Sequence, residues 1–227
     1  MGSTPMSLIV ALDSPDREFG SLVEDLCDIV DGFKLGLPLL MGRGVDYAAR
    51  LRSRCNRGLW IADLKLADIG HVMKLTTSLV VEHVDAVIAH GFVGIQGALG
   101  ELKEFLNSLG KKLVVVASMS HPGAREVYDK ALPLILNVIG ELEPWGIVAP
   151  ATRPQVITSI RERLGDSVTI LSPGVGAQGA EPGAAICAGA DYEIVGRLIT
   201  SSNDPRAAAL AVKDAQKQRL QACKRGA

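Results

Sequence analysis

Charged side chains stand where the sequence predicts that short apolar strands end. Asp63 and Lys65 close one apolar run, Asp68 follows shortly after, and Asp13 and Lys34 belong to the two preceding runs. Charges at the end of a buried strand are costly unless they pair, so a structural salt bridge is one interpretation. The other is an array of alternating charge, in which carboxylates keep a lysine protonated and the lysine stabilises negative charge that develops on a substrate.

A glycine-rich segment is the second candidate site. Residues 172–179 read Ser-Pro-Gly-Val-Gly-Ala-Gln-Gly, and Gly196-Arg197 ends a later apolar run. Glycines let backbone amides approach an anion closely, while Arg197 can add a bidentate contact and Gln178 a neutral donor. We expect a phosphate site here, and the alternative is a flexible surface loop. Four further polar residues are predicted at strand ends: His90, Ser118, Ser120 and Ser172. For His90 a hydrogen-bonded structural histidine is the favoured interpretation.

Short apolar runs, each followed by a helical stretch, must position these residues. Eight runs are found, at residues 8–13, 32–36, 59–65, 86–90, 113–118, 146–149, 169–172 and 192–196. This alternation predicts an α/β fold, a single (β/α)8 barrel domain over residues 1–227. In such a barrel the active site forms at the carboxyl ends of the strands, and the loops after the last two strands often bind phosphate. An open doubly wound sheet is the second choice, although the first strand–helix turn lacks G-x-G-x-x-G.

The helical stretches carry signals for their ends and faces. Asp204-Pro205 predicts the start of a last helix that runs to about Ala222, and Pro154 opens an earlier helix that stops before Gly165. Pro133 should kink or split the helix expected near 124–142. One helical face is predicted by the spacing of Val72, Leu75, Thr76 and Leu79. Further helices are expected near 43–54, 71–82 and 95–109.

Composition excludes several classes of protein. The chain has 227 residues, of which 48% are hydrophobic, and a net charge of −1, which argues against a nucleic-acid or anionic-membrane surface. No apolar run approaches the roughly 18–20 residues of a membrane span. Residues 1–6 are expected to be a disordered tail. They are not expected to be a secretory signal, because they lack a basic region followed by an apolar core. The cysteines are far apart and form no metal-binding motif, so we expect free thiols in a reducing cytoplasm: Cys27, Cys55, Cys187 and Cys223.

At these residues the chain resembles the orotidine 5'-monophosphate decarboxylases of the archaeal type, over nearly its whole length. The resemblance rests on six segments: Val10–Asp13, Phe33–Gly36, the D-x-K-x-x-D-I run Asp63–Ile69, Met119–Gly123, Ser172–Gln178 and Val195–Arg197. The D-x-K-x-x-D motif is shared with a metal-dependent sugar-phosphate decarboxylase and a hexulose-phosphate synthase. Lys34 favours the nucleotide enzymes, because the sugar-phosphate decarboxylases place an acidic residue there to help hold magnesium. The P-G-V-G-A-Q loop favours them as well.

The resemblance implies conversion of orotidine 5'-phosphate to uridine 5'-phosphate and carbon dioxide in pyrimidine biosynthesis, with no cofactor and no metal. Lys65 would donate a proton to C6 of the pyrimidine, and Asp63 would lie beside the substrate carboxylate. Lys34 and Asp68 would hold Lys65 in place, with Asp68 supplied across a homodimer interface. Substrate binding is implied for Asp13 and Lys34 at the ribose, Ser120 at the pyrimidine edge, Gln178, Gly196 and Arg197 at the phosphate, and for Ile69, Pro173 and Val175.

The sequence departs from this pattern just after Ile69. Family members often continue Pro-x-Thr, and the threonine reaches the partner's ribose, whereas here Gly70-His71-Val72 follow. We expect that contact to be lost or replaced, at a cost on the order of 0.5–1.5 kcal/mol. We expect residues 174–183 to form a lid.

Three alternative functions remain open. They are aldolase chemistry through a Schiff base on Lys65, a magnesium-dependent sugar-phosphate decarboxylase, and a non-catalytic nucleotide binder. Schiff-base chemistry needs a largely neutral lysine, and neighbouring carboxylates oppose this.

Overall fold

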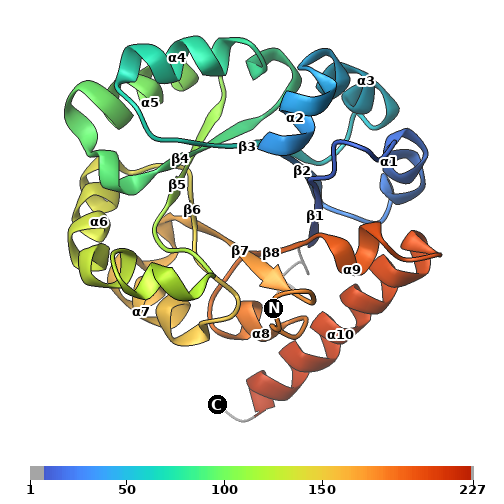
Figure 1. Cartoon of the computed structure of the whole chain (residues 1–227). Helices are drawn as coiled ribbons and strands as arrows, with labels where there is room; N and C mark the ends of the chain where they lie inside the picture. The colour runs from blue at the N-terminus through green and yellow to red at the C-terminus, as the bar shows by residue number, and fades with distance from the viewer. Residues whose placement is uncertain (1–7, 226–227) are drawn as a thin grey trace.

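The chain forms a closed barrel of parallel strands, seen end-on in Figure 1. The structure is a computed structural model, and it describes residues 8–225. The strands follow one another around the barrel in sequence order: β1 (Leu8–Leu12), β2 (Gly32–Gly36), β3 (Leu59–Leu66), β4 (Ala86–His90), β5 (Lys112–Val116), β6 (Gly146–Val148), β7 (Thr169–Val175) and β8 (Tyr192–Val195). Pairing of β1 with β8 closes the ring, with Val10 opposite Val195. The predicted barrel is confirmed, and the open sheet is excluded.

Helices surround the barrel, as expected for strands that are buried on both faces. They are α1 (Gly20–Leu26), α2 (Leu37–Arg43), α3 (Asp46–Arg54), α4 (Gly70–Ser78), α5 (Gly100–Ser108), α6 (Tyr128–Leu142), α7 (Pro154–Leu164), α8 (Ala184–Cys187), α9 (Arg197–Thr200) and α10 (Pro205–Arg225). The core is aliphatic, with Phe33 and Trp60 as its largest aromatic pair, their ring centroids 4.9 Å apart. The predicted tail at 1–6 lies outside the described residues.

Several helix boundaries differ from those predicted. The stretch near 43–54 contains the end of α2 and all of α3, because Gly44 breaks the chain direction with a φ of 76°. The stretch near 95–109 becomes regular only at α5, since Gln96 and Gly97 have non-helical backbone angles. Pro133 does not split α6, because it lies in the second turn and removes only one backbone donor. Asp204 caps α10 as predicted, accepting a bond of 2.9 Å from the Ala207 amide.

The predicted face of α4 exists, but it points away from the barrel. Met73 and Thr77 form the buried side of the helix, whereas Leu75 and Leu79 are 57% and 64% exposed. Ile69 and Val72, at the start of α4, are also exposed, as are Leu37 and Met41 of α2, the helix that follows β2. We call these six residues the α2–α4 apolar stripe. Single exposed apolar residues are normal, but several on the helices that follow two neighbouring strands of the barrel, β2 and β3, are typical of a surface that contacts another molecule.

The expectation of free thiols is wrong, because the structure contains two disulfides. Cys27 and Cys55, at the C-terminal ends of α1 and α3, are joined with a Cα–Cα distance of 5.6 Å. Cys187 of α8 is joined to Cys223 of α10, with a Cα–Cα distance of 6.2 Å. The pairs are separated by 28 and 36 residues in sequence, and only the helix packing of the fold brings them together.

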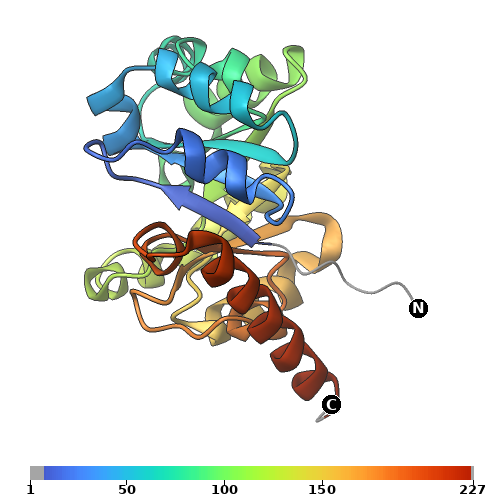
Figure 2. The ribbon, with the colours of Figure 1, turned by 90° about the vertical axis from the view of Figure 1, so that its right-hand side faces the viewer.

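The last helix, α10, packs near the pair of strands β1 and β8 that closes the barrel, against α1 and α8. Figure 2 shows α10 on the outside of the molecule, running away from β1. It is joined to α8 by the Cys187–Cys223 disulfide, while its Lys213 ammonium donates at 2.7 Å to the carbonyl of Ile29, which follows α1. No helix among residues 8–225 is long and apolar enough to span a membrane.

Candidate active site

Four charged side chains from three neighbouring strand ends form one connected array. The Lys34 ammonium lies 2.8 Å from an Asp13 carboxylate oxygen and 2.9 Å from Asp63. The Lys65 ammonium lies 2.7 Å from each of the two Asp63 oxygens. The charges therefore alternate in the order Asp13, Lys34, Asp63, Lys65, as the sequence predicted. The strand-end salt bridge is present, but it is part of a larger network.

The backbone of β3 departs from regular geometry at Lys65. This residue has a φ of 45°, in the left-handed region, and the register between β3 and β4 shifts between Ala62 and Leu66. A non-glycine residue in this conformation costs on the order of 1–3 kcal/mol, and such strain collects at functional sites. The bulge leaves the Lys65 side chain 40% exposed beside a buried Asp63, so its ammonium is accessible from the barrel mouth.

A glycine makes room for the array on β2. A Cβ placed on Gly36 would lie 2.0 Å from an Asp13 carboxylate oxygen. Any side chain at this position would therefore displace Asp13 from its contact with Lys34. This explains physically why Phe33-Lys34-Leu35-Gly36 ends in glycine.

Burial and pairing act in opposite directions on the two central groups. Burial alone would lower the pKa of Lys34, but the charges of Asp63 and Asp13 outweigh it, so the pKa lies above the ordinary 10.5. Burial alone would raise the pKa of Asp63, but attraction by Lys34 and Lys65 and their hydrogen bonds hold that pKa below 3.8. Both groups are therefore charged at neutral pH, in agreement with a preorganised electrostatic site.

The array lines one side of a cavity of about 330 Å³ at the barrel mouth. Ten of the predicted site residues line it: Asp13, Lys34, Asp63, Lys65, Ser120, Pro173, Val175, Gln178, Gly196 and Arg197. The rest of the lining is Ala11, Ile88, Val116, Ser118, Met119, Val148, Gly174, Ala177 and Ile194. Ser118 was predicted at a strand end and Gly174 and Ala177 in the glycine-rich segment, whereas sequence reasoning assigned no site role to the apolar strand residues among them. Strand alternation could have identified several of these, because Ile88, Val116 and Ile194 each lie near the end of a predicted strand.

Two predicted residues, Asp68 and Ile69, do not line this cavity. Both are exposed, and one Asp68 oxygen accepts a bond of 2.7 Å from the Ile69 amide. Among the side chains that the structure describes, no lysine, arginine or histidine nitrogen lies within 4.0 Å of the Asp68 carboxylate. The array of this single chain thus ends at Lys65.

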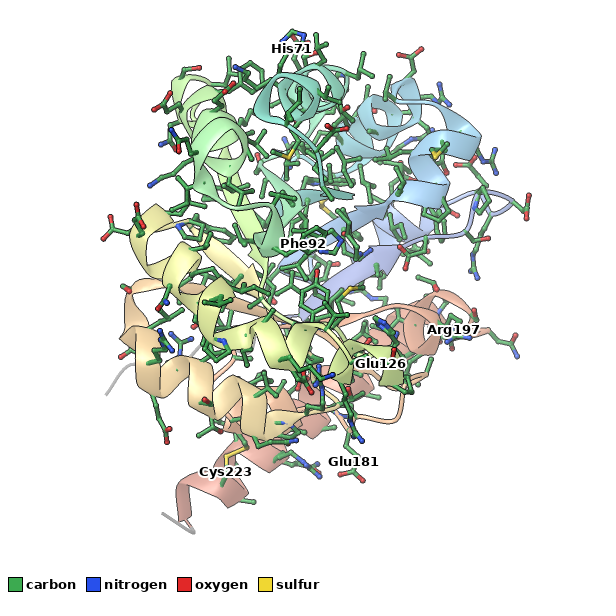
Figure 3. All side chains as sticks on the ribbon, turned by 60° about the vertical axis from the view of Figure 1, so that its left-hand side comes forward. His71, Phe92, Glu126, Glu181, Arg197 and Cys223 are labelled. Carbon is green, nitrogen blue, oxygen red and sulfur yellow. A yellow bond between two sulfur atoms is a disulfide. The ribbon has the colours of Figure 1, made fainter. Side chains whose placement is uncertain are left out.

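The opposite wall comes from residues 174–183, which we call the glycine-rich loop, and from the start of α9. The loop folds back on itself through a bond of 2.8 Å from the Gly176 amide to the Ala180 carbonyl. Gly174, Gly176 and Gly179 all have positive φ, which L side chains rarely adopt. Arg197 is exposed at the surface of α9 (Figure 3), so its guanidinium is available for an anion.

A buried arginine holds the segment that carries Ser120. Arg153 donates to both Asp129 oxygens, at 2.5 and 2.7 Å, to the Ser118 hydroxyl at 2.6 Å, and to the Met119 carbonyl. No role was predicted for Arg153, because its neighbour Pro154 indicated only the start of a helix. Only the fold places the guanidinium behind the cavity wall.

Two strand-end residues have structural roles. His90 forms a hydrogen bond with the Tyr128 hydroxyl and does not line the cavity, which confirms the structural interpretation. Burial lowers the pKa of His90, and the charge of Lys65 lowers it further. The Ser172 hydroxyl is buried and donates to the Ala149 carbonyl at 2.7 Å. Among the described residues, no group of three or more His, Cys, Asp or Glu side chains is placed to hold a metal ion.

Comparison with known proteins gives a consistent family. The sequence model of the orotidine 5'-phosphate decarboxylase / HUMPS family matches residues 6–212. A curated orotidine 5'-phosphate decarboxylase from Aeropyrum pernix is 49% identical over 94% of this chain and 90% of its own length.

Solved structures give the same result. Orotidine 5'-monophosphate decarboxylase from Sulfolobus solfataricus has a TM-score of 0.88 and 36% identity, over 95% of this chain and 99% of its own. The enzyme from Methanocaldococcus jannaschii complexed with the inhibitor BMP has a TM-score of 0.86 and 33% identity, over 93% and 98%.

Proposed function

Because the chain belongs to the orotidine 5'-phosphate decarboxylase / HUMPS family, we propose that it converts orotidine 5'-phosphate to uridine 5'-phosphate and carbon dioxide. The single observation that carries this proposal is the Asp13–Lys34–Asp63–Lys65 array inside a cavity whose opposite wall is the glycine-rich loop with Arg197. This reaction is a step in pyrimidine nucleotide biosynthesis.

Lys34 distinguishes this function from the sugar-phosphate chemistry of the same family. A magnesium site needs a set of oxygen ligands, and Lys34 brings an ammonium into the centre of the carboxylates that would supply them. Because the charges of Asp63 and Asp13 outweigh burial and keep Lys34 protonated, this ammonium opposes a divalent cation at the same position.

The array supports a proton-transfer role for Lys65. When the bond from C6 to the carboxylate breaks, its electron pair stays on C6, and a Lys65 N–H donates a proton to that carbon. Asp63 accepts from the Lys65 ammonium through both oxygens and so orients it, and, close to the substrate carboxylate, it opposes the bound ground state more than the transition state. Preorganised charge of this kind stabilises the developing carbanion without reorganisation at the moment of reaction.

The far wall of the cavity supports phosphate binding. Gln178, Gly196 and Arg197 lie together there and provide a neutral donor, close backbone approach and a guanidinium. Ser120 lies at the mouth, where it can read the pyrimidine edge, and Asp13 with Lys34 can bind the ribose. The phosphate is remote from the bond that breaks, so its binding energy can position the reacting end and close the glycine-rich loop as a lid.

We also propose that the active form is a homodimer that buries the α2–α4 apolar stripe. The stripe is next to Asp68, and Asp68 has no cationic partner in the described part of its own chain. In an isologous dimer the same stripe of two copies meets, which brings Asp68 of one copy towards the mouth of the other. Asp68 then completes the partner's array beside Lys65.

Mixing of two variants tests this sharing of Asp68. Lys65→Ala and Asp68→Asn should each be nearly inactive, whereas the two mixed, unfolded together and refolded should recover about a quarter of wild-type activity, because half of the dimers then contain one intact site. If Asp68 acts within its own chain, the mixture stays inactive. Leu75→Glu should give monomers by light scattering, with Leu109→Glu, another exposed leucine outside the stripe, as the matched control.

The location is part of the proposal and is cytoplasmic. The argument from free thiols no longer supports it, because both cysteine pairs are oxidised. Intracellular disulfides are common in hyperthermophilic archaea, and the chain is similar to enzymes from archaea such as Aeropyrum pernix.

The experiment that tests the function is turnover of orotidine 5'-phosphate followed by ultraviolet absorbance, with and without EDTA. We expect turnover that EDTA does not change. Turnover of a hexulose phosphate that EDTA abolishes would instead support the sugar-phosphate decarboxylase. Trapping of a sugar phosphate on Lys65 by borohydride would support the aldolase.

A further inference from the structure

A buried carboxylate lies behind the glycine-rich loop and outside the cavity. Glu193 of β8 is fully buried, and its side chain points away from the barrel interior, whereas the next residue, Ile194, lines the cavity. Burial of a carboxylate is costly unless several donors satisfy it. The groups that donate hydrogen bonds to Glu193 therefore indicate which segments this carboxylate holds together.

Three N–H groups bind this carboxylate, and none belongs to its own strand. The Gly183 amide donates at 2.8 Å and the Ala185 amide at 3.0 Å, one to each carboxylate oxygen. The Gln216 side-chain amide of α10 donates at 3.0 Å to the same oxygen as Gly183. Glu193 thus joins β8, the last residue of the glycine-rich loop and the C-terminal helix at one point.

The last helix packs directly against the end of the loop. A Cβ on Gly183 would lie 2.9 Å from the Arg219 Cβ and 3.1 Å from the Gln216 Cα, and the φ of Gly183 is 84°. Nearby, Glu181 in the loop forms an ion pair with Arg219 on α10. Figure 3 shows Glu181 beside α10 and Cys223 near the end of that helix.

These contacts fix the C-terminal end of the glycine-rich loop, which is not part of the sheet. The other end continues β7 up to Val175 and is fixed by strand pairing with β8. Between the two ends lie Ala177 and Gln178, which line the cavity. Gly196 and Arg197 follow Glu193 on the same chain segment, so the loop and the arginine depend on one anchor.

We propose that Glu193 is a positioning residue for the substrate phosphate, and that through it the C-terminal helix sets the place of the glycine-rich loop. This inference rests on the proposed function, since the phosphate is that of orotidine 5'-phosphate. Glu193 touches neither the substrate nor the charged array. Its loss therefore weakens phosphate binding and leaves proton transfer at Lys65 unchanged.

The test compares KM with kcat in two variants. Glu193→Gln keeps the shape of the side chain but presents an NH2 group to one backbone N–H. We expect KM for orotidine 5'-phosphate and Kd for uridine 5'-phosphate to rise about tenfold, with kcat within about twofold of wild type. Gln216→Ala removes one donor and should give a rise of about threefold.

Val212→Ala is the matched control, because Val212 is buried on α10 but makes none of these contacts. It should lower Tm and leave KM and Kd at their wild-type values. The inference is overturned if Glu193→Gln folds with unchanged KM and Kd, or if Val212→Ala raises KM as much at an equal loss of Tm. If Glu193→Gln does not fold, an unchanged KM in Gln216→Ala overturns it.

If the proposed function is wrong, the measurements differ from those that overturn the role of Glu193. In that case the wild-type chain does not decarboxylate orotidine 5'-phosphate. The binding of uridine 5'-phosphate to wild type and variants, measured by calorimetry, still tests the anchor. A wild-type chain that does not bind uridine 5'-phosphate overturns both proposals.

Discussion

Removal of either disulfide should lower the free energy of unfolding by an amount that follows from the length of the loop it closes. A cross-link restricts the unfolded chain, and the loss of entropy grows with the logarithm of loop length. For the separations of 28 and 36 residues this gives about 3.6 kcal/mol for Cys27–Cys55 and about 3.8 kcal/mol for Cys187–Cys223 at 25 °C. In a domain of this size each loss corresponds to a fall in Tm of about 7–15 °C.

The assay is thermal unfolding of double alanine variants, one for each cysteine pair, with and without reductant. Alanine is suitable because Cys55 is buried, and a serine there would add an unpaired hydroxyl. With reductant, the Tm of wild type should fall below the Tm of either double variant measured without reductant. The Tm of a variant that lacks all four cysteines should not respond to reductant. The kcat at 25 °C should not change, because none of these cysteines lines the cavity.

Two results would refute this reasoning. The first is four reactive thiols in unfolded wild-type protein that was never reduced. The second is a Tm that does not respond to reductant. Either result would restore the free thiols expected from the sequence.

Three further outcomes are expected. Asp63 titrates below its ordinary pKa of 3.8, so its stabilisation is present above pH 3.8 and is lost as the pH falls through its folded-state pKa; denaturant midpoints should therefore fall more steeply with acid in wild type than in Asp63→Asn. Arg153→Met should lower kcat/KM about tenfold by releasing the Ser118–Ser120 segment, measured by steady-state kinetics, and an unchanged kcat/KM would remove this role. Gln178→Ala should raise KM about tenfold with little change in kcat, whereas a loss confined to kcat would argue against phosphate binding by this residue.

The barrel and most of the site could be predicted because both depend on local patterns. Buried parallel strands read as apolar runs, and the residue that ends each run lies at the mouth by the geometry of the fold. For this reason Asp13, Lys34, Asp63 and Lys65 could be placed together without knowledge of any contact. The glycine-rich loop and Arg197 followed from their position after the last two strands.

Other features depend on contacts between distant segments, which a single sequence does not reveal. The cysteine pairs are brought together by helix packing, and their spacing resembles that of unrelated thiols. The spacing of Leu75 and Leu79 predicted a helical face but not its direction, because an apolar face can pack on the barrel or on another molecule. Arg153 binds Asp129, and Glu193 accepts from Gln216. In both pairs the partners are more than twenty positions apart in sequence, so no local pattern indicated either contact.

The backbone at Lys65 is a further limit of sequence reasoning. The sequence predicted Asp63 and Lys65 at the end of one strand, and both line the cavity. Alternation does not predict a left-handed residue or a register shift, since these occur where surrounding packing imposes a conformation that the residue itself disfavours. The most strained residue of the array is thus the one to which we assign the proton transfer.

The central claim is tested most directly by decarboxylation of orotidine 5'-phosphate by wild type and Lys65→Ala, followed by ultraviolet absorbance. We expect the variant to lose about a thousandfold in kcat/KM, because it lacks the proton donor. Lys74→Ala is the matched control, since Lys74 pairs with Glu101 on the surface and does not line the cavity, and it should keep wild-type activity. Full activity in Lys65→Ala, or no turnover by folded wild-type protein, would contradict the account.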